Sequence, residues 1–201
     1  MLFHYHFWTP NVEETEKFYI ENGFRVTQRV GKKDGEFQSF DPPLNWEDFR
    51  GLDITFRIIE VRKGAINITF GYGKKVMFDH IGFLVTRKEH DDICKSAKSL
   101  KWNVHSNDRR TFIGTPYNFR IELQTNRDAI DEDSEDAARI EALEITVKDA
   151  HVEHDIRQLL KEMAIDLTFK LGKNVTIHKA MLSRMSFLNE TDPNGVSLIT
   201  K

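Results

Sequence analysis

The sequence of 201 residues has a single cysteine, Cys94, and no long apolar run. One cysteine cannot form a disulfide within the chain, which excludes a disulfide-stapled secreted domain and favours a reducing compartment, the cytoplasm. No stretch approaches the roughly 18 apolar residues of a membrane-spanning helix, and residues 1–6 lack the basic and apolar regions of a secretory signal. We therefore expect a cytoplasmic protein that does not associate with a membrane.

An excess of basic charge is also lacking. Lys and Arg number 29 against 32 Asp and Glu, which gives a formal net charge of -3, whereas a dedicated nucleic-acid binder carries a basic surplus. We expect no nucleic-acid partner. The aromatic residues are placed unevenly: half of them lie within the first 50 residues, where they supply material for a core or a ligand cleft.

Three segments of the chain repeat one order of elements, a strand, then a helix, then about three further strands. The segments are residues 1–75, 76–126 and 139–201. Residues 127–138, between the second and the third, include six acidic residues and one basic residue and are typical of a solvated linker. Self-similarity of this kind predicts a modular fold.

Turn signals and side-chain spacing place the elements within each segment. Helices are expected where apolar residues recur at helical spacing, with Asn11 and Asp149 as N-caps and Gly23 as a stop. Strands are expected where β-branched and aromatic residues cluster between turn residues. The expected helices are 12–22, 88–100 and 150–163, and the expected strands are 2–9, 24–30, 54–61, 65–70, 76–86, 103–105, 111–113, 119–124, 140–147, 167–171, 176–188 and 196–200.

A single βαβββ unit leaves one face of a curved sheet uncovered, so such units are expected to pair. We predict an α+β fold of repeated βαβββ modules, in which modules 1–75 and 76–126 form an open, cup-shaped mixed sheet and module 139–201 is extra. The third module must cover its apolar face either by folding back on the cup or by pairing with its copy in a second chain. Of the two, we favour the homodimer.

Two histidines, His4 and His80, occupy matching positions in the first two modules. Each lies in the opening strand, at the same distance in sequence from the middle of the following helix. The opening strand and helix of module one, and the stretch FDHIGFLV at 78–85, resemble the vicinal-oxygen-chelate superfamily of glyoxalase, bleomycin-resistance and extradiol-dioxygenase proteins. The stretch TPYNFRIELQ at 115–124 resembles the closing strand of that superfamily, with an apolar-Glu-apolar triplet centred on Glu122.

The resemblance implies a cup that holds a divalent metal ion, with His4, His80 and Glu122 at ligand positions. The fourth ligand position falls near Thr69, so two histidines and one carboxylate remain, which resembles the dioxygenase arrangement more than the glyoxalase one. Such a set suits Fe, Mn, Zn or Ni and leaves coordination positions open for a substrate with adjacent oxygen atoms. The third module has Ala142 in place of the histidine, and Ser197 or Ile199 near the carboxylate position, so we expect it to be a scaffold.

Strand alternation places His4, His6 and Trp8 on one face and the intervening aromatic residues, Phe3 among them, on the other. His6 therefore competes with His4 as a metal ligand, or acts as a catalytic base beside the metal. The extradiol enzymes have a catalytic tyrosine at a position that Phe112 fills here. Tyr117 lies near that position but out of register, and is our candidate for a second catalytic residue.

The candidate substrate-binding residues are Arg109 and Arg110, for an anionic group, and Trp8 and Trp46, as walls of an apolar pocket. We expect a metal-dependent enzyme of the glyoxalase or dioxygenase type that acts on a small oxygenated substrate. The alternative is a drug-sequestering protein that uses the same cup to bind a small molecule without a metal. The metal content of the purified protein distinguishes the two.

Overall fold

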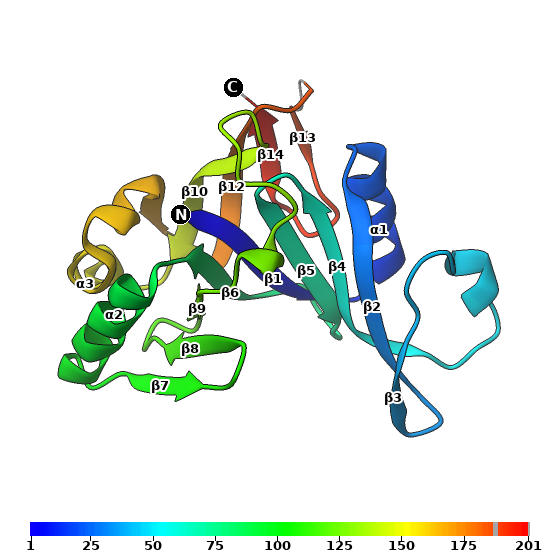
Figure 1. Ribbon diagram of the computed structural model, residues 1–201, viewed down its shortest axis with the longest axis horizontal. Helices are drawn as coiled ribbons and strands as arrows, with labels where there is room; N and C mark the ends of the chain where they lie inside the picture. The colour runs from blue at the N-terminus through cyan, green and yellow to red at the C-terminus, as the bar shows by residue number, and fades with distance from the viewer. Residues whose placement is uncertain (187–188, 201) are drawn as a thin grey trace.

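The computed structural model describes residues 1–186 and 189–200. In this part of the chain there are two mixed β-sheets, three α-helices and three short 3-10 helices (Figure 1). The predicted α+β fold of repeated βαβββ modules is confirmed. None of the described helices is long and apolar enough to cross a membrane.

The first sheet has nine strands in the order β3-β2-β4-β5-β1-β6-β9-β8-β7. Its strands are β1 (Leu2–Thr9), β2 (Arg25–Lys33), β3 (Glu36–Ser39), β4 (Thr55–Lys63), β5 (Ile66–Tyr72), β6 (Met77–Leu84), β7 (Asn103–Ser106), β8 (Arg110–Gly114) and β9 (Arg120–Gln124). Helix α1 (Val12–Glu21) follows β1, and helix α2 (Arg87–Ser99) follows β6 at the equivalent place. The two predicted modules therefore join edge to edge through β1 and β6.

Strands β1 and β6 form the antiparallel centre of this sheet, in which His6 pairs with His80 and His4 with Gly82. Strand β9 runs parallel to β6 and pairs Glu122 with the same Gly82. The register of β1 shifts between Leu2 and His4, and Phe3 lines the same cavity as His4. The prediction that Phe3 lies on the opposite face is therefore wrong, because strict alternation does not survive a register shift.

The second sheet has five strands in the order β11-β10-β12-β14-β13. Its strands are β10 (Arg139–Val147), β11 (Leu167–Leu171), β12 (Thr176–Ser183), β13 (Asn189–Thr191) and β14 (Ser197–Thr200). Helix α3 (His151–Leu160) and a 3-10 helix, η3 (Lys161–Asp166), connect β10 to β11. Strand β13 is absent from the sequence prediction, and the end of the predicted strand 176–188 includes residues 187 and 188, outside the described part.

The centre of the second sheet repeats that of the first. Strand β10 pairs antiparallel with β12 and parallel with β11, as β1 pairs with β6 and β5, and β12 pairs parallel with β14 as β6 does with β9. The two register shifts recur at matching places, between Ile140 and Ala142 and between Glu144 and Ile145. Residues 139–200 thus supply both halves of a central strand pair within one chain.

The apolar face of the second sheet is covered by the first sheet. Strand β10 contacts β1, and β12 contacts β6. One core cluster includes Phe7 and Phe78 from the first sheet together with Ile145 and Ile177 from the second. The third module therefore folds back on the cup, and the physical reason for expecting a homodimer, an uncovered apolar face, is wrong.

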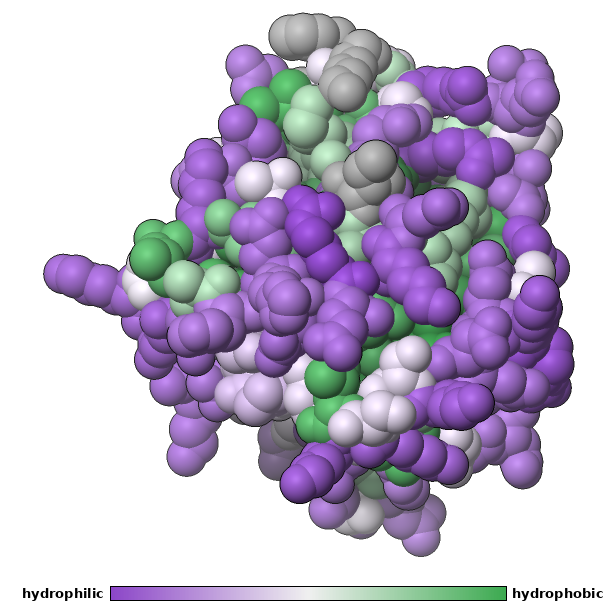
Figure 2. Space-filling model, turned by 90° about the vertical axis from the view of Figure 1, so that its left-hand side faces the viewer, coloured by the Kyte–Doolittle hydropathy of each residue, from purple (hydrophilic) through white to green (hydrophobic). Residues whose placement is uncertain are grey.

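Helix α1 packs against β2, β4 and β5 of the first sheet, helix α2 packs against β7, and helix α3 packs against β11 of the second sheet. Helix α2 begins with a capping box, in which the Thr86 hydroxyl accepts from the backbone of Glu89 and the Glu89 carboxylate accepts from the backbone of Thr86. Helices α2 and α3 pack side by side at the left of Figure 1, and the face of the molecule on that left-hand side is mainly hydrophilic with small apolar areas (Figure 2). Asn11 makes no side-chain cap; its amide donates instead to the carbonyl of Pro193, at 3.2 Å.

Residues 127–138, here called the acidic strap, run from the end of β9 to the start of β10 and include the 3-10 helix η2 (Arg127–Ala129). Residues 131–136 are exposed, but Ala129, Ile130, Ala137 and Ala138 are buried. Gly64, in the turn between β4 and β5, has φ +58 and lies so close to the strap that a side chain there would collide with the backbone of Ala138. The strap is thus packed against the first sheet along part of its length.

Candidate metal centre

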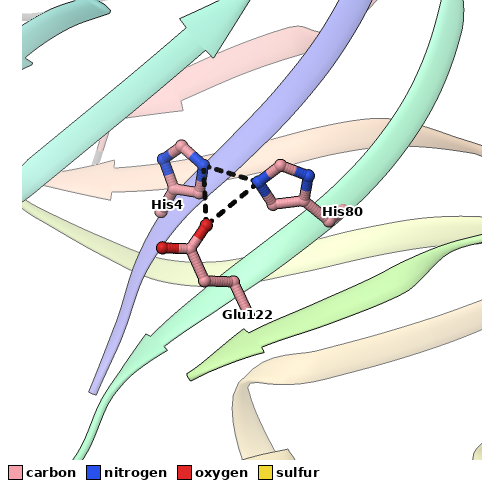
Figure 3. Close-up of side chains that lie close together, drawn as sticks. All are labelled: His4, His80 and Glu122. Atoms are coloured by element: carbon pink, nitrogen blue, oxygen red, sulfur yellow. Dashed lines mark hydrogen bonds and ion pairs between the residues drawn. The ribbon is translucent and has the colours of Figure 1, made fainter. Parts of the chain in front are cut away.

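Three buried side chains converge at the centre of the first sheet: His4 from β1, His80 from β6 and Glu122 from β9 (Figure 3). The Nε2 atoms of the two histidines lie 2.9 Å apart. The Oε2 atom of Glu122 is 3.2 Å from Nε2 of His80 and 3.9 Å from Nε2 of His4. The predicted ligand residues are therefore brought together at one point.

Strand register explains this convergence. Gly82 pairs with His4 on one side and with Glu122 on the other, so the two ligands flank it from neighbouring strands. His80 lies two residues away on the same strand and shares the face of Gly82. A Cβ at residue 82 would lie 2.8 Å from Cβ of His4, so the glycine provides the space that the His4 side chain occupies.

The Nδ1 atoms of His4 and His80, called here the outer nitrogens, are hydrogen-bonded to acceptors. Nδ1 of His4 lies 2.9 Å from the carbonyl oxygen of Asn67, and Nδ1 of His80 lies 2.6 Å from Oδ2 of Asp79. A carbonyl and an ionised carboxylate can only accept, so each Nδ1 carries the proton and each Nε2 is left with a lone pair. Hydrogen bonds of this kind orient metal-binding histidines in proteins.

The charges of the ligand residues at neutral pH are also suited to a cation. Burial lowers the pKa of His4 to about 4. Burial acts to raise the pKa of Glu122, but its interactions with the neighbouring His80, His4 and Arg110 outweigh burial and lower the pKa to about 2. A neutral imidazole and an ionised carboxylate are the forms that bind a metal.

The donor set fits a divalent ion on its own chemistry. Two imidazole nitrogens and one carboxylate oxygen, with other positions open, are typical of non-haem iron sites and also suit related divalent metals. Two lone-pair nitrogens 2.9 Å apart require a proton or a cation between them, because they otherwise repel each other. The three residues could therefore hold a metal ion.

His6 lies beside this centre but is not one of the three converging residues. Its ring stacks on that of His80, with centroids 5.1 Å apart and planes 4° apart. Its Nδ1 is 2.6 Å from the Thr69 hydroxyl, while its Nε2 is buried and has no hydrogen-bond partner. Burial, with the neighbouring histidines, lowers the pKa of His6 well below its usual value. Between the two candidate ligands on β1, the geometry thus favours His4.

An open cavity of about 600 Å³ adjoins the centre, with His4 and Glu122 in its wall. Arg109 and Arg110, predicted to bind substrate, both line it; Nη1 of Arg110 lies 3.4 Å from Oε2 of Glu122. The other lining residues, most of them polar, are Phe3, Arg25, Thr27, Gln28, Asp41, Glu60, Arg62, Asn67, Thr69, Gln124, Asp128 and Ala129. Sequence reasoning missed Arg25 and Arg62, because they lie in module one, on strands that only the folded sheet brings near the ligands.

The acidic strap forms part of the cavity wall through Asp128 and Ala129. The Asp128 carboxylate binds Arg109, at 2.9 Å, and the backbone carbonyl of Asp128 accepts from Arg62, at 2.7 Å. The Ala129 carbonyl accepts from the side chain of Asn67, at 2.8 Å. The backbone carbonyl of Asn67 accepts in turn from the His4 ring, so two hydrogen bonds through Asn67 connect the strap to His4.

Two predicted site residues lie elsewhere. Tyr117 does not line the cavity; its hydroxyl donates to Asp155 of α3, at 2.6 Å, because the turn before β9 carries it toward that helix. The catalytic role predicted for Tyr117 has no support in this placement. The ring of Phe112 does lie at the site, edge-on to His80 with centroids 5.1 Å apart, but it offers no hydroxyl.

The two tryptophans that were predicted to bind substrate, Trp8 and Trp46, are also outside the cavity. Trp46 donates from its indole nitrogen to Glu16, at 3.0 Å, and packs against Phe49 and Phe56, where it lines a different pocket. Trp8 lies edge-on to His6, with centroids 4.6 Å apart, and lines a separate depression. Neither forms the predicted wall of the substrate cavity.

No model of a protein family matches the sequence, and no curated protein sequence matches it. Solved structures do match. The 2,2',3-trihydroxybiphenyl 1,2-dioxygenase from Sphingomonas wittichii strain RW1 has a TM-score of 0.65 at 13% identity, over 100% of this chain and 90% of that one. Homoprotocatechuate 2,3-dioxygenase from Arthrobacter globiformis has a TM-score of 0.60 at 10% identity, over 100% and 79%. A hypothetical protein from Staphylococcus aureus has a TM-score of 0.58 at 9% identity, over 100% and 98%.

These neighbours include extradiol dioxygenases, which are members of the vicinal-oxygen-chelate superfamily. The chain has the fold of that superfamily, as its sequence motifs predicted. At such low identity the likeness extends to the fold alone, so the function is argued from the residues of the site.

Proposed function

We propose that the chain is a metal-dependent enzyme of the dioxygenase type, acting on a small substrate with two neighbouring oxygen atoms. The observation that carries the proposal is the meeting of two lone-pair imidazole nitrogens and one carboxylate beside an open cavity. His4, His80 and Glu122 would hold the ion. When bound, it would supply Lewis-acid polarisation and open coordination positions for the two oxygens.

The remaining side chains have separate tasks in this proposal. Arg110 faces the ligand carboxylate and would orient an anionic oxygen of the substrate within the cavity. His6 does not line the cavity; its buried ring stacks on that of His80, so in this proposal it positions that ligand instead of contacting the substrate. Phe112 keeps the space beside His80 apolar and, because it has no hydroxyl group, cannot act as a proton donor.

The test is a metal titration with a matched control. Fe(II), Mn(II), Zn(II) and Ni(II) are titrated anaerobically into the wild-type chain, into His80→Ala and into His178→Ala, which removes an exposed histidine of the second sheet. We expect one equivalent to bind to the wild type and to His178→Ala, and none to bind tightly to His80→Ala. Oxygen uptake with small vicinal diols and catechols then tests the reaction.

Two outcomes would contradict the proposal. Equal binding by the two variants would place the metal elsewhere, and no tight binding by the wild type would support the metal-independent binding protein instead. A small-molecule ligand screen by thermal shift would then take the place of the activity assay. The homodimer and the cytoplasmic location stay predictions, which sedimentation and localisation in cells would test.

A further inference from the structure

A second depression, of about 470 Å³, opens near the strand ends next to the metal centre and shares no lining residue with the substrate cavity. The ends of β1 and β5, the loop between β5 and β6, and parts of β4, β6 and β9 form it. Its lining residues are Trp8, Arg57, Tyr72, Gly73, Lys74, Lys75, Met77, Asp79 and Arg120. The feature that distinguishes it is its charge.

Four basic side chains surround one acid in this depression. The acid, Asp79, is already bonded to His80 and to Arg120. Among the residues that the structure describes, Arg57, Lys74 and Lys75 have no carboxylate within ion-pair distance, and all three are exposed. The depression therefore has three positive charges that no acid of the described chain balances.

The floor of the depression is aromatic and closely packed. The guanidinium carbon of Arg57 lies 4.3 Å from the centroid of the Trp8 ring. Side chains at Gly71 and Gly73 would come within 2.7 and 2.8 Å of Trp8, so these glycines let its ring lie against the end of β5. Tyr72 is 47% exposed beside it, as is Met77, which gives an apolar surface next to the cations.

We propose that this depression binds a small phosphorylated compound that carries an aromatic group. A phosphate monoester has close to two negative charges at pH 7 and three strong acceptor oxygens, which matches three unpaired basic side chains. The aromatic group would lie on the exposed surfaces of Tyr72 and Met77. A single carboxylate would leave most of this positive charge unbalanced, and a nucleic-acid strand needs a longer basic track than one depression.

The experiment measures binding of 1-naphthyl phosphate by isothermal titration, with 1-naphthol and inorganic phosphate as comparison ligands. The variant is Lys74→Ser/Lys75→Ser, and the matched control is Lys32→Ser/Lys33→Ser at the end of β2, which removes the same charge elsewhere. We expect the Lys74→Ser/Lys75→Ser variant to bind about tenfold more weakly than wild type, since charge-assisted bonds to phosphate are lost, and the control to bind as wild type. Both comparison ligands should bind more weakly than 1-naphthyl phosphate.

Three results would overturn the proposal: no binding of 1-naphthyl phosphate at millimolar concentration, equal binding by both variants, or binding of 1-naphthol as tight as that of its phosphate. Inorganic phosphate that binds as tightly as 1-naphthyl phosphate would refute the aromatic part. Lys32, Lys74 and Lys75 are exposed and Lys33 is only partly buried, so thermal unfolding should change little in either variant. The His4→Ala chain should bind the probe unchanged, because the side-chain hydrogen bonds of His4 go to residues that do not line the depression, and this keeps the test independent of the metal centre.

Discussion

Gly82 separates His4 from Glu122, and an alanine there should damage the metal centre. The added Cβ would lie 2.8 Å from Cβ of His4 and 3.1 Å from its Cδ2, whereas ordinary contacts lie at 3.4–4 Å. The Cβ of His4 is fixed to the backbone of a central strand, so β1 and β6 must separate by about 0.6 Å, the difference between 2.8 and 3.4 Å. Overpacking of this kind costs about 1–3 kcal/mol of unfolding free energy.

The same displacement moves one ligand relative to the other two. Functional sites need their first contacts held within about 0.5 Å, so we expect the metal affinity of Gly82→Ala to fall at least about tenfold. The matched control is Gly114→Ala in β8, where the nearest atom to a new Cβ is 3.8 Å away. That variant should gain about 0.4–1 kcal/mol through the unfolded state.

Urea unfolding of the apo proteins measures the stability change, and competition with a chromophoric chelator for Zn(II) measures the affinity. A Gly82→Ala chain as stable as wild type, with unchanged zinc affinity, would refute the reasoning that the glycine provides the space for His4. A loss of stability without a loss of affinity would refute only its second half.

Three further predictions concern other parts of the molecule. Arg29 forms a bidentate ion pair with Glu16, both almost fully buried; Arg29→Met should cost about 3–5 kcal/mol, and Glu16→Leu with it should recover part of the loss, as urea unfolding would show. The pKa of His4 falls on folding from 6.5 to about 4, so the unfolded chain takes up this proton first. The stability that neutral His4 contributes to the apo protein is complete above pH 6.5 and is lost as the pH falls from 6.5 to 4, by roughly 3 kcal/mol. The unfolding free energy of His4→Phe should lack this slope over the same pH range. Asp79→Asn should weaken zinc binding about 10–100-fold without unfolding the chain, because the His80 ring loses its charged acceptor.

Much of the site could be predicted from local sequence. The matched positions of His4 and His80 in two modules, together with the resemblance, predict the two histidines of the site, whereas strand alternation alone leaves His6 as a competitor of His4 because both share a face. The Glu122 triplet adds the third ligand by resemblance. The role of Asp79 also has a local signal, since it precedes a predicted ligand, but only the structure shows its carboxylate bonded to the outer nitrogen of His80.

The features that could not be predicted from the sequence depend on contacts between distant segments. The side chains of Trp46 and Tyr117 have local features that suit a ligand pocket, yet their partners are Glu16 and Asp155, each far away in sequence. The position of the acidic strap depends on Gly64 and Asn67 of module one. Such long-range side-chain contacts are determined by the tertiary fold and produce no periodic pattern in the sequence.

The pairing within the third module was mispredicted for a similar reason. Its order of elements, a strand, a helix and more strands, is the order expected. The antiparallel pairing of β10 with β12, however, is a property of sheet order and not of element order. The module therefore needs no second copy to complete its central pair.

The repeated register of the second sheet has a consequence for stoichiometry. The residues that correspond there to His4, His80 and Glu122 are Ala142, Lys179 and Ile199. A lysine amine at the place of an imidazole would repel a cation, and neither alanine nor isoleucine offers a ligand atom, so this second centre is closed to metal. Each chain should then saturate at one ion, although it contains two strand-pair centres of the same design.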